Sequence, residues 1–274
     1  MKFRFLGTGT SVGVPQIGCG CQTCVSSDPR DRRRRCGAYV DAASASFLID
    51  TPPELRLACV EYAISKVDAV VLTHAHMDHV AVFDDVRRFN TINGTVVKCD
   101  PSEPGANGRT SRIVGKPLPC YASKETEEQM HRIFPYISDK GGENGLFRPQ
   151  ILVDNADSFS IGDVRVERLK VEHGFPCCGY LIGGRLAYIP DMHSMPDETY
   201  GKIAGVDTLV INCLRVRPHP THQNLESMLA AAGRIGPRRA YIVHVCHDLT
   251  HAQWAERLAG TNVEPAWDGL EIEA

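Results

Sequence analysis

The stretch His74-Ala75-His76-Met77-Asp78-His79 decides the fold, because it places four metal-binding side chains within six positions. It directly follows the run from Val67 to Thr73, which is apolar, short and rich in β-branched residues, and which therefore predicts a buried strand. Side chains alternate along an extended segment, so the first two histidines point to the same side. A turn into a helix then brings the aspartate and the last histidine toward the same point.

The location and chemistry of this cluster both indicate a metal site. It lies where a strand ends and a helix begins, which is where α/β sheets usually carry their chemistry. Imidazoles and a carboxylate that converge favour Zn²⁺, Mn²⁺ or Fe²⁺ over Ca²⁺ or Mg²⁺. The plainer alternative is a polar loop that happens to contain three histidines.

Later strands end in the same way. They deliver His173 after a strand at 164–171, Asp191 after one at 185–189, and His244 after one at 239–243. An earlier strand at 45–50 ends in Asp50, which we expect to orient one ligand histidine through a hydrogen bond. Each residue alone would more often be a satisfied histidine or a capping aspartate, but the repetition predicts one shared site. Helices are predicted over 53–64, 82–89 and 124–134.

Eleven cysteines are a high count, and the N-terminus lacks the apolar segment and cleavage site of a signal peptide. Metal ligation and buried thiols are therefore better explanations than a disulfide framework. Cys19, Cys21 and Cys24, spaced C-x-C-x-x-C, supply three of the four ligands of a tetrahedral zinc site. The fourth ligand must come from elsewhere; the alternative is a set of isolated buried cysteines.

The composition is that of an ordinary globular protein. At 274 residues the chain has room for one large α/β domain or two small ones. Its net charge of −3 gives no argument for nucleic acid or an anionic membrane as a partner. Since no apolar run approaches the roughly 20 residues that span a bilayer, we expect a cytoplasmic protein.

Three segments leave alternatives open. The glycine-rich residues 7–13 follow a strand and could cradle a phosphate, but no helical pattern follows, so a tight turn is predicted. The charged run at 28–35 predicts a solvated loop, with phosphate binding by one or two of its arginines as the alternative. Residues 91–117 lack periodicity and predict an inserted, structureless loop.

The histidine and aspartate set resembles the metallo-β-lactamase superfamily of hydrolases. Residues 7–15, together with the three spaced cysteines, are similar to the branch that contains phosphoribosyl 1,2-cyclic phosphate phosphodiesterase. The resemblance covers nearly the whole chain apart from 91–117, and Val82 stands where the motif commonly has glycine. It implies a single α/β (α+β) domain over 1–274, built as a four-layer αββα sandwich with a dinuclear site at one edge.

The resemblance also implies roles for individual residues. One divalent ion, Zn or Mn, would bind His74, His76 and His173; the other would bind Asp78, His79 and His244; Asp191 would bridge them. His247 would complete a structural zinc site with the three cysteines. His222, which precedes a helix, would be the general acid and, with Asp78, a catalytic residue. Alternatively, His222 caps the helix or binds a loop carbonyl, and His219 is a weaker rival.

The implied activity is that of a metal-dependent phosphodiesterase acting on a small phosphate ester, cyclic esters included, through a hydroxide that bridges the two metals. One alternative is a tRNA 3′-processing endonuclease, whose RNA grip would come from basic residues of the insertion: Lys98, Arg109, Arg112 and Lys116. The chain lacks that family's His-Glu-Ala-Thr signature. Further alternatives are a lactone or thioester hydrolase and a non-catalytic metal-binding module. Homodimers are common in the superfamily, and neither a membrane nor a nucleic acid is an expected partner.

Overall fold

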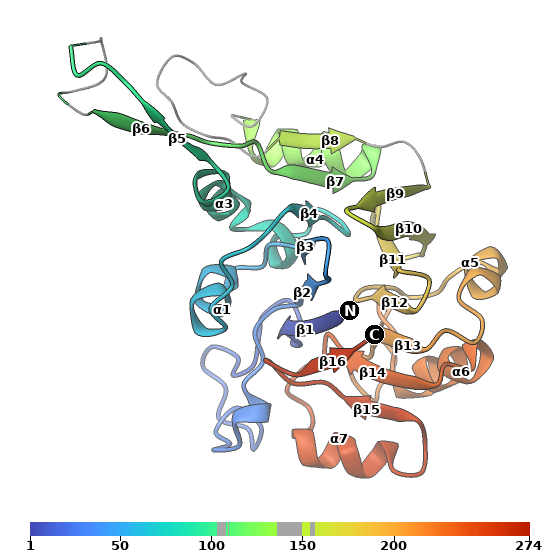
Figure 1. Cartoon of the computed structure of the whole chain (residues 1–274). Coiled ribbons are helices and arrows are strands. Elements are labelled where there is room, and N and C mark those ends of the chain that lie inside the picture. The colour runs from blue at the N-terminus through green and yellow to red at the C-terminus, as the bar shows by residue number, and fades with distance from the viewer. Residues whose placement is uncertain (103–107, 109, 136–149, 154–156) are drawn as a thin grey trace.

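Two sheets packed face to face form the centre of the protein (Figure 1). The computed structural model describes residues 1–102, 108, 110–135, 150–153 and 157–274. The first sheet has the spatial order β16 (Glu271–Glu273), β1 (Lys2–Gly7), β2 (Gly37–Asp41), β3 (Ser46–Ile49), β4 (Ala69–Val71), β7 (Pro119–Ala122), β8 (Gln150–Val153). The second has the order β15 (Val263–Pro265), β14 (Arg239–Val243), β13 (Thr208–Asn212), β12 (Leu186–Ile189), β11 (Cys178–Ile182), β10 (Val164–Lys170), β9 (Ser158–Ile161).

Each sheet combines an antiparallel and a parallel half. In the first sheet β16, β1, β2 and β3 are antiparallel neighbours, whereas β3, β4, β7 and β8 run parallel. In the second, β9 to β12 are antiparallel and β12 to β15 parallel. Strands β3 and β4, and likewise β10, β12 and β14, therefore end at one edge of their sheet, and the chemistry-bearing residues follow those ends.

Helices cover the two outer faces. The first sheet packs against α1 (Leu55–Glu61), α2 (Met77–Val80), the 3₁₀ turn η2 (Phe83–Val86), α3 (Arg87–Ile92) and α4 (Lys124–Ile133). The second packs against α5 (Asp197–Lys202), α6 (Leu225–Ile235) and α7 (His251–Leu258). Within the described ranges, none of these helices is long and apolar enough to cross a membrane.

Three apolar clusters hold the layers together. The central cluster lies between the sheets, where Phe47 and Phe5 of the first sheet meet Tyr188 and Tyr241 of the second. The outer clusters fill the space between each sheet and its helices, with Phe83 on one side and the fully buried Trp254 on the other. Burial on both faces explains why β4 and β12 have no polar alternation in their sequences. The αββα sandwich is thus confirmed.

Most predicted elements are present but shorter. The strand predicted at 67–73 is β4 at Ala69–Val71, and the helix predicted at 53–64 is α1 at Leu55–Glu61. The helix predicted at 82–89 is divided between η2 and α3. The apolar pattern in the sequence includes residues that are buried but lie beyond the last hydrogen bonds of the element. The predicted elements are therefore longer than the observed ones.

The prediction of a structureless insertion is wrong for part of residues 91–117. Strands β5 (Thr95–Lys98) and β6 (Ser111–Val114) pair as an antiparallel hairpin that projects from the body (Figure 1). Both contain β-branched pairs, which favour strands even where no longer periodicity is visible. Residues 103–107 and Arg109 of the insertion lie outside the described residues.

The solvated-loop prediction for 28–35 is wrong at Arg33, which is 2% exposed. Its guanidinium donates to the Ala266 carbonyl at 2.7 Å and to the Thr8 hydroxyl at 3.1 Å. The adjacent Arg34 and Arg35 form ion pairs with glutamates. The run fastens the N-terminal loop to the body of the protein.

The glycine-rich segment is explained by close packing against this run. A Cβ added to Gly7 would lie 1.9 Å from the Arg35 carbonyl oxygen, and one added to Gly9 would lie 2.8 Å from the Arg33 Cβ. Gly9 also forms a parallel bridge with Val245. The glycines therefore let the arginine segment and the end of β14 approach the turn.

Candidate metal centres

The predicted ligands come together at one edge of the sandwich. His74 follows β4, Asp191 follows β12 and His244 follows β14, while His79 lies in the short helix α2. Four groups of side chains at this edge each have their ligand atoms within 4.8 Å of one another: His74, His76 and His173; Asp78, His79 and His244; His74, His79 and Asp191; His173, Asp191 and His222. The overlapping membership indicates one continuous site.

Asp191 lies between the two histidine groups. Its Oδ2 is 2.7 Å from His79 Nε2 and 3.9 Å from His74 Nε2, and its Oδ1 is 3.1 Å from His244 Nε2. The carboxylate, which is 1% exposed, therefore faces members of both groups at once.

These short distances are not hydrogen bonds. Both Asp191 oxygens and His79 Nε2 are buried without an acceptably aligned hydrogen-bond partner among the described residues. Burying such groups unsatisfied is costly. A cation requires ligand lone pairs that point toward a common centre rather than at each other. The Asp191 oxygens and His79 Nε2 meet this requirement, so the residues present fit a divalent metal ion.

Hydrogen bonds behind the histidines hold the rings. His79 Nδ1 donates to Asp50 Oδ2 at 2.8 Å, and His74 Nδ1 donates to the Thr73 hydroxyl at 3.0 Å. Thr73 in turn donates its hydroxyl to Asp50 Oδ2 at 2.8 Å. One buried carboxylate thus orients two rings and leaves each Nε2 facing the site. Sequence reasoning identified Asp50 but missed Thr73, although its position beside the motif was a usable signal.

His173 and His222 also lie against Asp191. His173 Nδ1 donates to the Thr221 carbonyl at 2.9 Å, and His222 Nδ1 is 3.1 Å from Asp191 Oδ1. The His222 ring stacks on that of His244 with centroids 4.7 Å apart. The alternative of a helix cap is wrong, because Asn224 caps α6 through its bond from the Ser227 amide.

The electrostatics favour a positive charge at the centre. Burial lowers the pKa of His74 well below its usual range and that of His173 to about 4, so both are neutral at pH 7. Burial also opposes charge on His79, but the carboxylates of Asp191 and Asp50 raise its pKa well above its usual range. Burial alone would raise the pKa of Asp78, yet hydrogen bonds and charge from His244 and His79 hold that pKa well below the usual range of an aspartate.

Two of the site residues have strained backbones. Asp50 has φ 63° and His244 has φ 59°, in the left-handed region that non-glycine residues rarely adopt. Each follows the end of a strand, and the turn aims its side chain into the site. Such strain persists only where the surroundings fix it, and it concentrates at functional sites.

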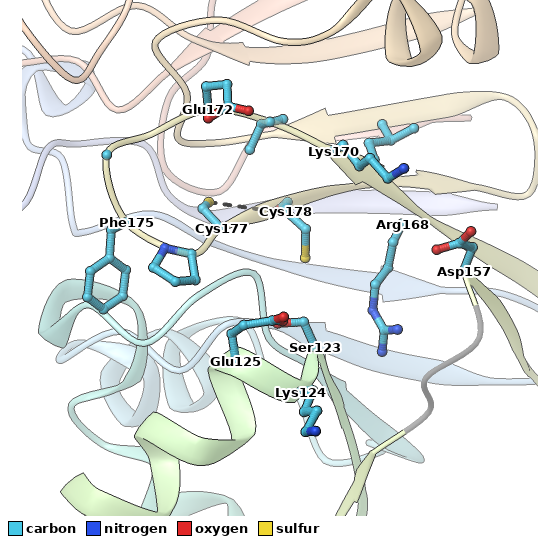
Figure 2. Close-up of a pocket in the computed structure, with 14 residues that line it drawn as sticks. Ser123, Lys124, Glu125, Asp157, Arg168, Lys170, Glu172, Phe175, Cys177 and Cys178 are labelled. Carbon is cyan, nitrogen blue, oxygen red and sulfur yellow. Dashed lines mark hydrogen bonds between the residues drawn. The ribbon is translucent and has the colours of Figure 1, made fainter.

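A pocket of about 400 Å³ opens onto this cluster, and Ser11, Met77 and Phe175 contribute to its walls. A larger cavity of about 790 Å³ adjoins it and shares Gly174 and Phe175 with it (Figure 2). Cys178 lines this second cavity from β11.

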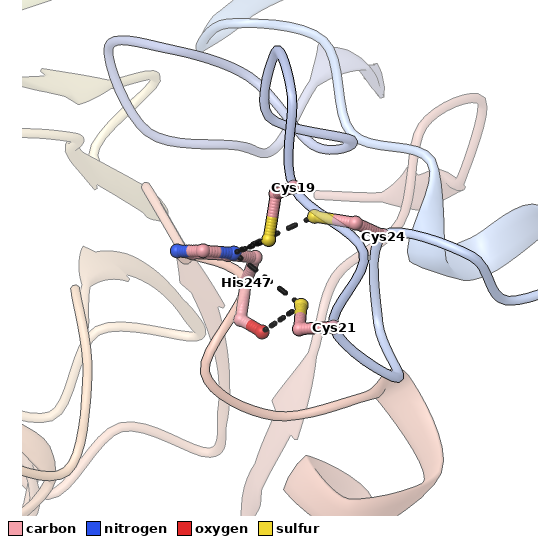
Figure 3. Close-up of side chains that lie close together, drawn as sticks. All are labelled: Cys19, Cys21, Cys24 and His247. Atoms are coloured by element: carbon pink, nitrogen blue, oxygen red, sulfur yellow. Dashed lines mark hydrogen bonds between the residues drawn. The ribbon is translucent and has the colours of Figure 1, made fainter.

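The cysteine motif forms a separate cluster with His247 (Figure 3). His247 Nδ1 lies 3.2 Å from the Cys19 sulfur and 3.4 Å from those of Cys21 and Cys24. In a tetrahedral zinc site with usual bond lengths, nitrogen and sulfur ligands are about 3.6 Å apart. The backbone of Cys24 and the neighbouring thiols lower the pKa of Cys21 to about 6, which favours the metal-binding thiolate. The four side chains fit one zinc ion.

An αββα sandwich with histidines and aspartates gathered at one edge defines a class of metal-dependent hydrolases. A sequence model of the beta-lactamase superfamily domain matches residues 45–245. The chain belongs to this superfamily, as its motifs predicted.

Individual proteins are similar over the whole chain. The crystal structure of a diphosphatase from the PhnP family is 32% identical, with a TM-score of 0.84 over 100% of this chain and 97% of that one. The metallo-beta-lactamase fold protein YhfI from Bacillus subtilis is 19% identical, with a TM-score of 0.71 over 99% of both chains, and shows the shared fold. An octanoyltransferase of Porphyromonas gingivalis (strain ATCC BAA-308 / W83) is 30% identical over 99% of this chain. The chain spans 51% of that relative's length.

Proposed function

We propose that this protein is a metal-dependent phosphoric ester hydrolase that acts on a small phosphodiester or diphosphate. The observation that carries the proposal is the convergence of buried, unsatisfied carboxylate and imidazole atoms around Asp191. The phosphate preference is supported by the 32% identity to a diphosphatase along the whole chain.

The proposed ligand sets follow these groups of converging atoms. One divalent ion, Zn or Mn, would bind His74, His76 and His173; the other would bind Asp78, His79 and His244; Asp191 would contact both. Divalent ions held there supply Lewis acidity, which acidifies water and offsets the charge of a phosphoryl group. A structural zinc ion would bind the three cysteines and His247.

The protein's own groups would then orient the reaction. Asp50 and Thr73 hold the rings of His79 and His74 in the tautomer whose Nε2 faces the centre. His222, 14% exposed at the pocket wall, directs Nδ1 at Asp191, which leaves Nε2 for the leaving oxygen. A proton from His222 to that oxygen is the general-acid step, which is typically worth about 10²–10⁴ in rate.

The test is a substrate panel on protein purified without chelators, with metal content measured on the same samples. The panel contains bis(p-nitrophenyl) phosphate, a cyclic phosphate, a dinucleoside diphosphate, a lactone and an octanoyl thioester. We expect turnover of phosphorus esters that disappears with a chelator and returns with Zn²⁺ or Mn²⁺. Turnover restricted to the lactone or the thioester would overturn the phosphate assignment.

An RNA endonuclease is the second candidate, because the β5–β6 hairpin projects from the body as an arm (Figure 1). Lys98 and Lys116 are both exposed there, although the chain's net charge is −3. Endonucleolytic cleavage of a precursor tRNA, lost when the hairpin is deleted, would favour this candidate. Formation of a homodimer stays a prediction.

A further inference from the structure

The cavity beside the candidate metal centre has the size of a ligand site. At about 790 Å³ it lies within the range of small-molecule pockets, and it is about twice as large as the metal-facing pocket. Gly174 and Phe175 line both spaces. A substrate whose phosphorus lies over the histidines can therefore extend one arm past these two residues.

Phe175 provides an aromatic surface at the junction. Its ring stacks on His76 with centroids 4.2 Å apart and planes inclined by 30°, and the residue remains half-buried. Figure 2 shows the ring on the wall of the larger cavity. A half-buried ring that borders two cavities offers a planar group of the substrate a place to stack.

Gly174 lies where the two cavities adjoin and adds no side chain there. Its φ is 76°, a conformation that residues with side chains rarely adopt. A Cβ at this position would meet the Thr221 methyl at 3.4 Å, on the side where His173 donates to the Thr221 carbonyl. The glycine thus leaves the passage between the two cavities free of a side chain.

The charges of the cavity indicate the chemistry of the arm. Three cations and three carboxylates line it: Lys124, Arg168, Lys170, Glu125, Asp157 and Glu172. Lys170 is paired with Glu198 at 3.1 Å, and Arg168 donates to the Ala122 carbonyl at 2.6 Å. Because positive and negative side chains are equal in number, the lining does not favour a second phosphate, which would need an excess of positive charge. It suits a neutral group rich in hydrogen-bond donors and acceptors.

We propose that the larger cavity binds a nucleoside arm of the substrate, with its base stacked on Phe175 and its polar atoms facing the charged lining. This inference rests on the proposed function and specifies its substrate class as a nucleoside phosphodiester or diphosphate ester. The nucleoside bound in the larger cavity stays attached to phosphorus after hydrolysis, and the group on the other side of phosphorus leaves.

The experiment compares two diesters with the same leaving group. Methyl p-nitrophenyl phosphate and thymidine 5′-(p-nitrophenyl phosphate) both release p-nitrophenolate when water attacks phosphorus, and only the second carries a nucleoside. We expect a KM for the thymidine ester about tenfold lower, which lies within the stacking range of one base on an aromatic ring. The preference should fall to about twofold or less in Phe175→Leu and persist in Phe175→Tyr.

Bound metal is measured in every variant, because Phe175 contacts His76. Glu125→Arg, which changes a residue of the larger cavity that does not line the metal-facing pocket, should also lower the thymidine preference while leaving metal content unchanged. Equal KM values in the wild-type protein, or a preference that survives Phe175→Leu, would overturn the inference. If neither ester is hydrolysed, the wider substrate panel decides the proposed function. Calorimetric binding of thymidine monophosphate against methyl phosphate then decides the cavity's role separately, and equal affinities would overturn the inference.

Discussion

The two candidate metal-binding clusters lie three residues apart at His244 and His247, yet they are built differently. The cysteine cluster offers four ligand atoms, three of them sulfur, which is the full set of a tetrahedral zinc site. The edge cluster offers nitrogen and oxygen ligands, shares Asp191 between groups, and opens onto a pocket of about 400 Å³. Closed sulfur-rich sites are typical of structural zinc, and open sites with spare ligand positions are typical of catalysis.

The hydrogen bonds that hold the ligand side chains also differ between the two clusters. Behind the edge cluster, Asp50 and Thr73 fix the tautomers of two histidines and are themselves fully buried. Around the cysteine cluster the described contacts are mainly among the ligands themselves. A structural site only needs its ligands close together, whereas a reactive site also needs each ligand atom aimed. Substitutions in the two clusters should therefore have separable effects.

The largest expected effect is that of Asp191→Asn. Removing the shared charge should empty the edge cluster and reduce hydrolysis about 10³-fold or more, because the ions' Lewis acidity is worth several kcal/mol. Elemental analysis should still find the ion of the cysteine cluster. Full edge-cluster occupancy in this variant would contradict a bridging carboxylate.

His222→Ala should have the second-largest effect. We expect kcat to fall about 10²–10⁴-fold for a substrate with an alkyl leaving group. The fall should be much smaller for a p-nitrophenyl ester, because p-nitrophenolate leaves without a proton. Metal content should not change. A loss of metal would instead make His222 a ligand, which its proximity to His173 and Asp191 allows. Wild-type rates on the alkyl ester would remove the general-acid role.

Asp50→Asn should weaken metal affinity or activity about 10–100-fold, as is usual when the hydrogen-bond partner of a ligand histidine is changed. The measurement is a competition titration of Zn²⁺ at the edge cluster. Asp41→Asn, at the exposed end of β2, is the matched control and should match the wild-type affinity. Equal affinities for both variants would show that Asp50 does not support the centre.

The smallest effect on catalysis should be that of Cys21→Ser. One zinc ion per chain should be lost, and the melting temperature should fall by about 5–10 °C, since losing a few kcal/mol has this effect in a chain of this size. Cys59→Ser, a half-buried thiol outside the cluster, provides the control. Unchanged zinc and melting temperature would exclude the four-ligand site.

The sequence predicted the elements that carry strong local signals. Buried strands such as β14 and the residues that follow them could be located because an apolar run ends abruptly in a histidine or an aspartate. Those strand ends meet because the strands share a direction, which the superfamily resemblance implied. The roles assigned to the individual ligands stay predictions.

Other features depend on contacts between distant segments and leave no local signal. Arg33 looks like part of a solvated run, and only the fold shows that it lies beneath Ala266 and Thr8. The hairpin of β5 and β6 was missed because each strand has only four residues. The cavity next to Phe175 lies between strand β10 and helix α4, so no single stretch of sequence could reveal it.

The pairing of β1 with β16 has a consequence for protein fusions. The Ala274 amide donates to the Met1 carbonyl at 2.8 Å, so both ends of the chain meet at one place (Figure 1). Strand β1 runs toward the metal-facing edge, and β16 runs away from it, so that place is at the opposite end of the sheet. An additional domain joined at either end would be attached away from the pocket mouth.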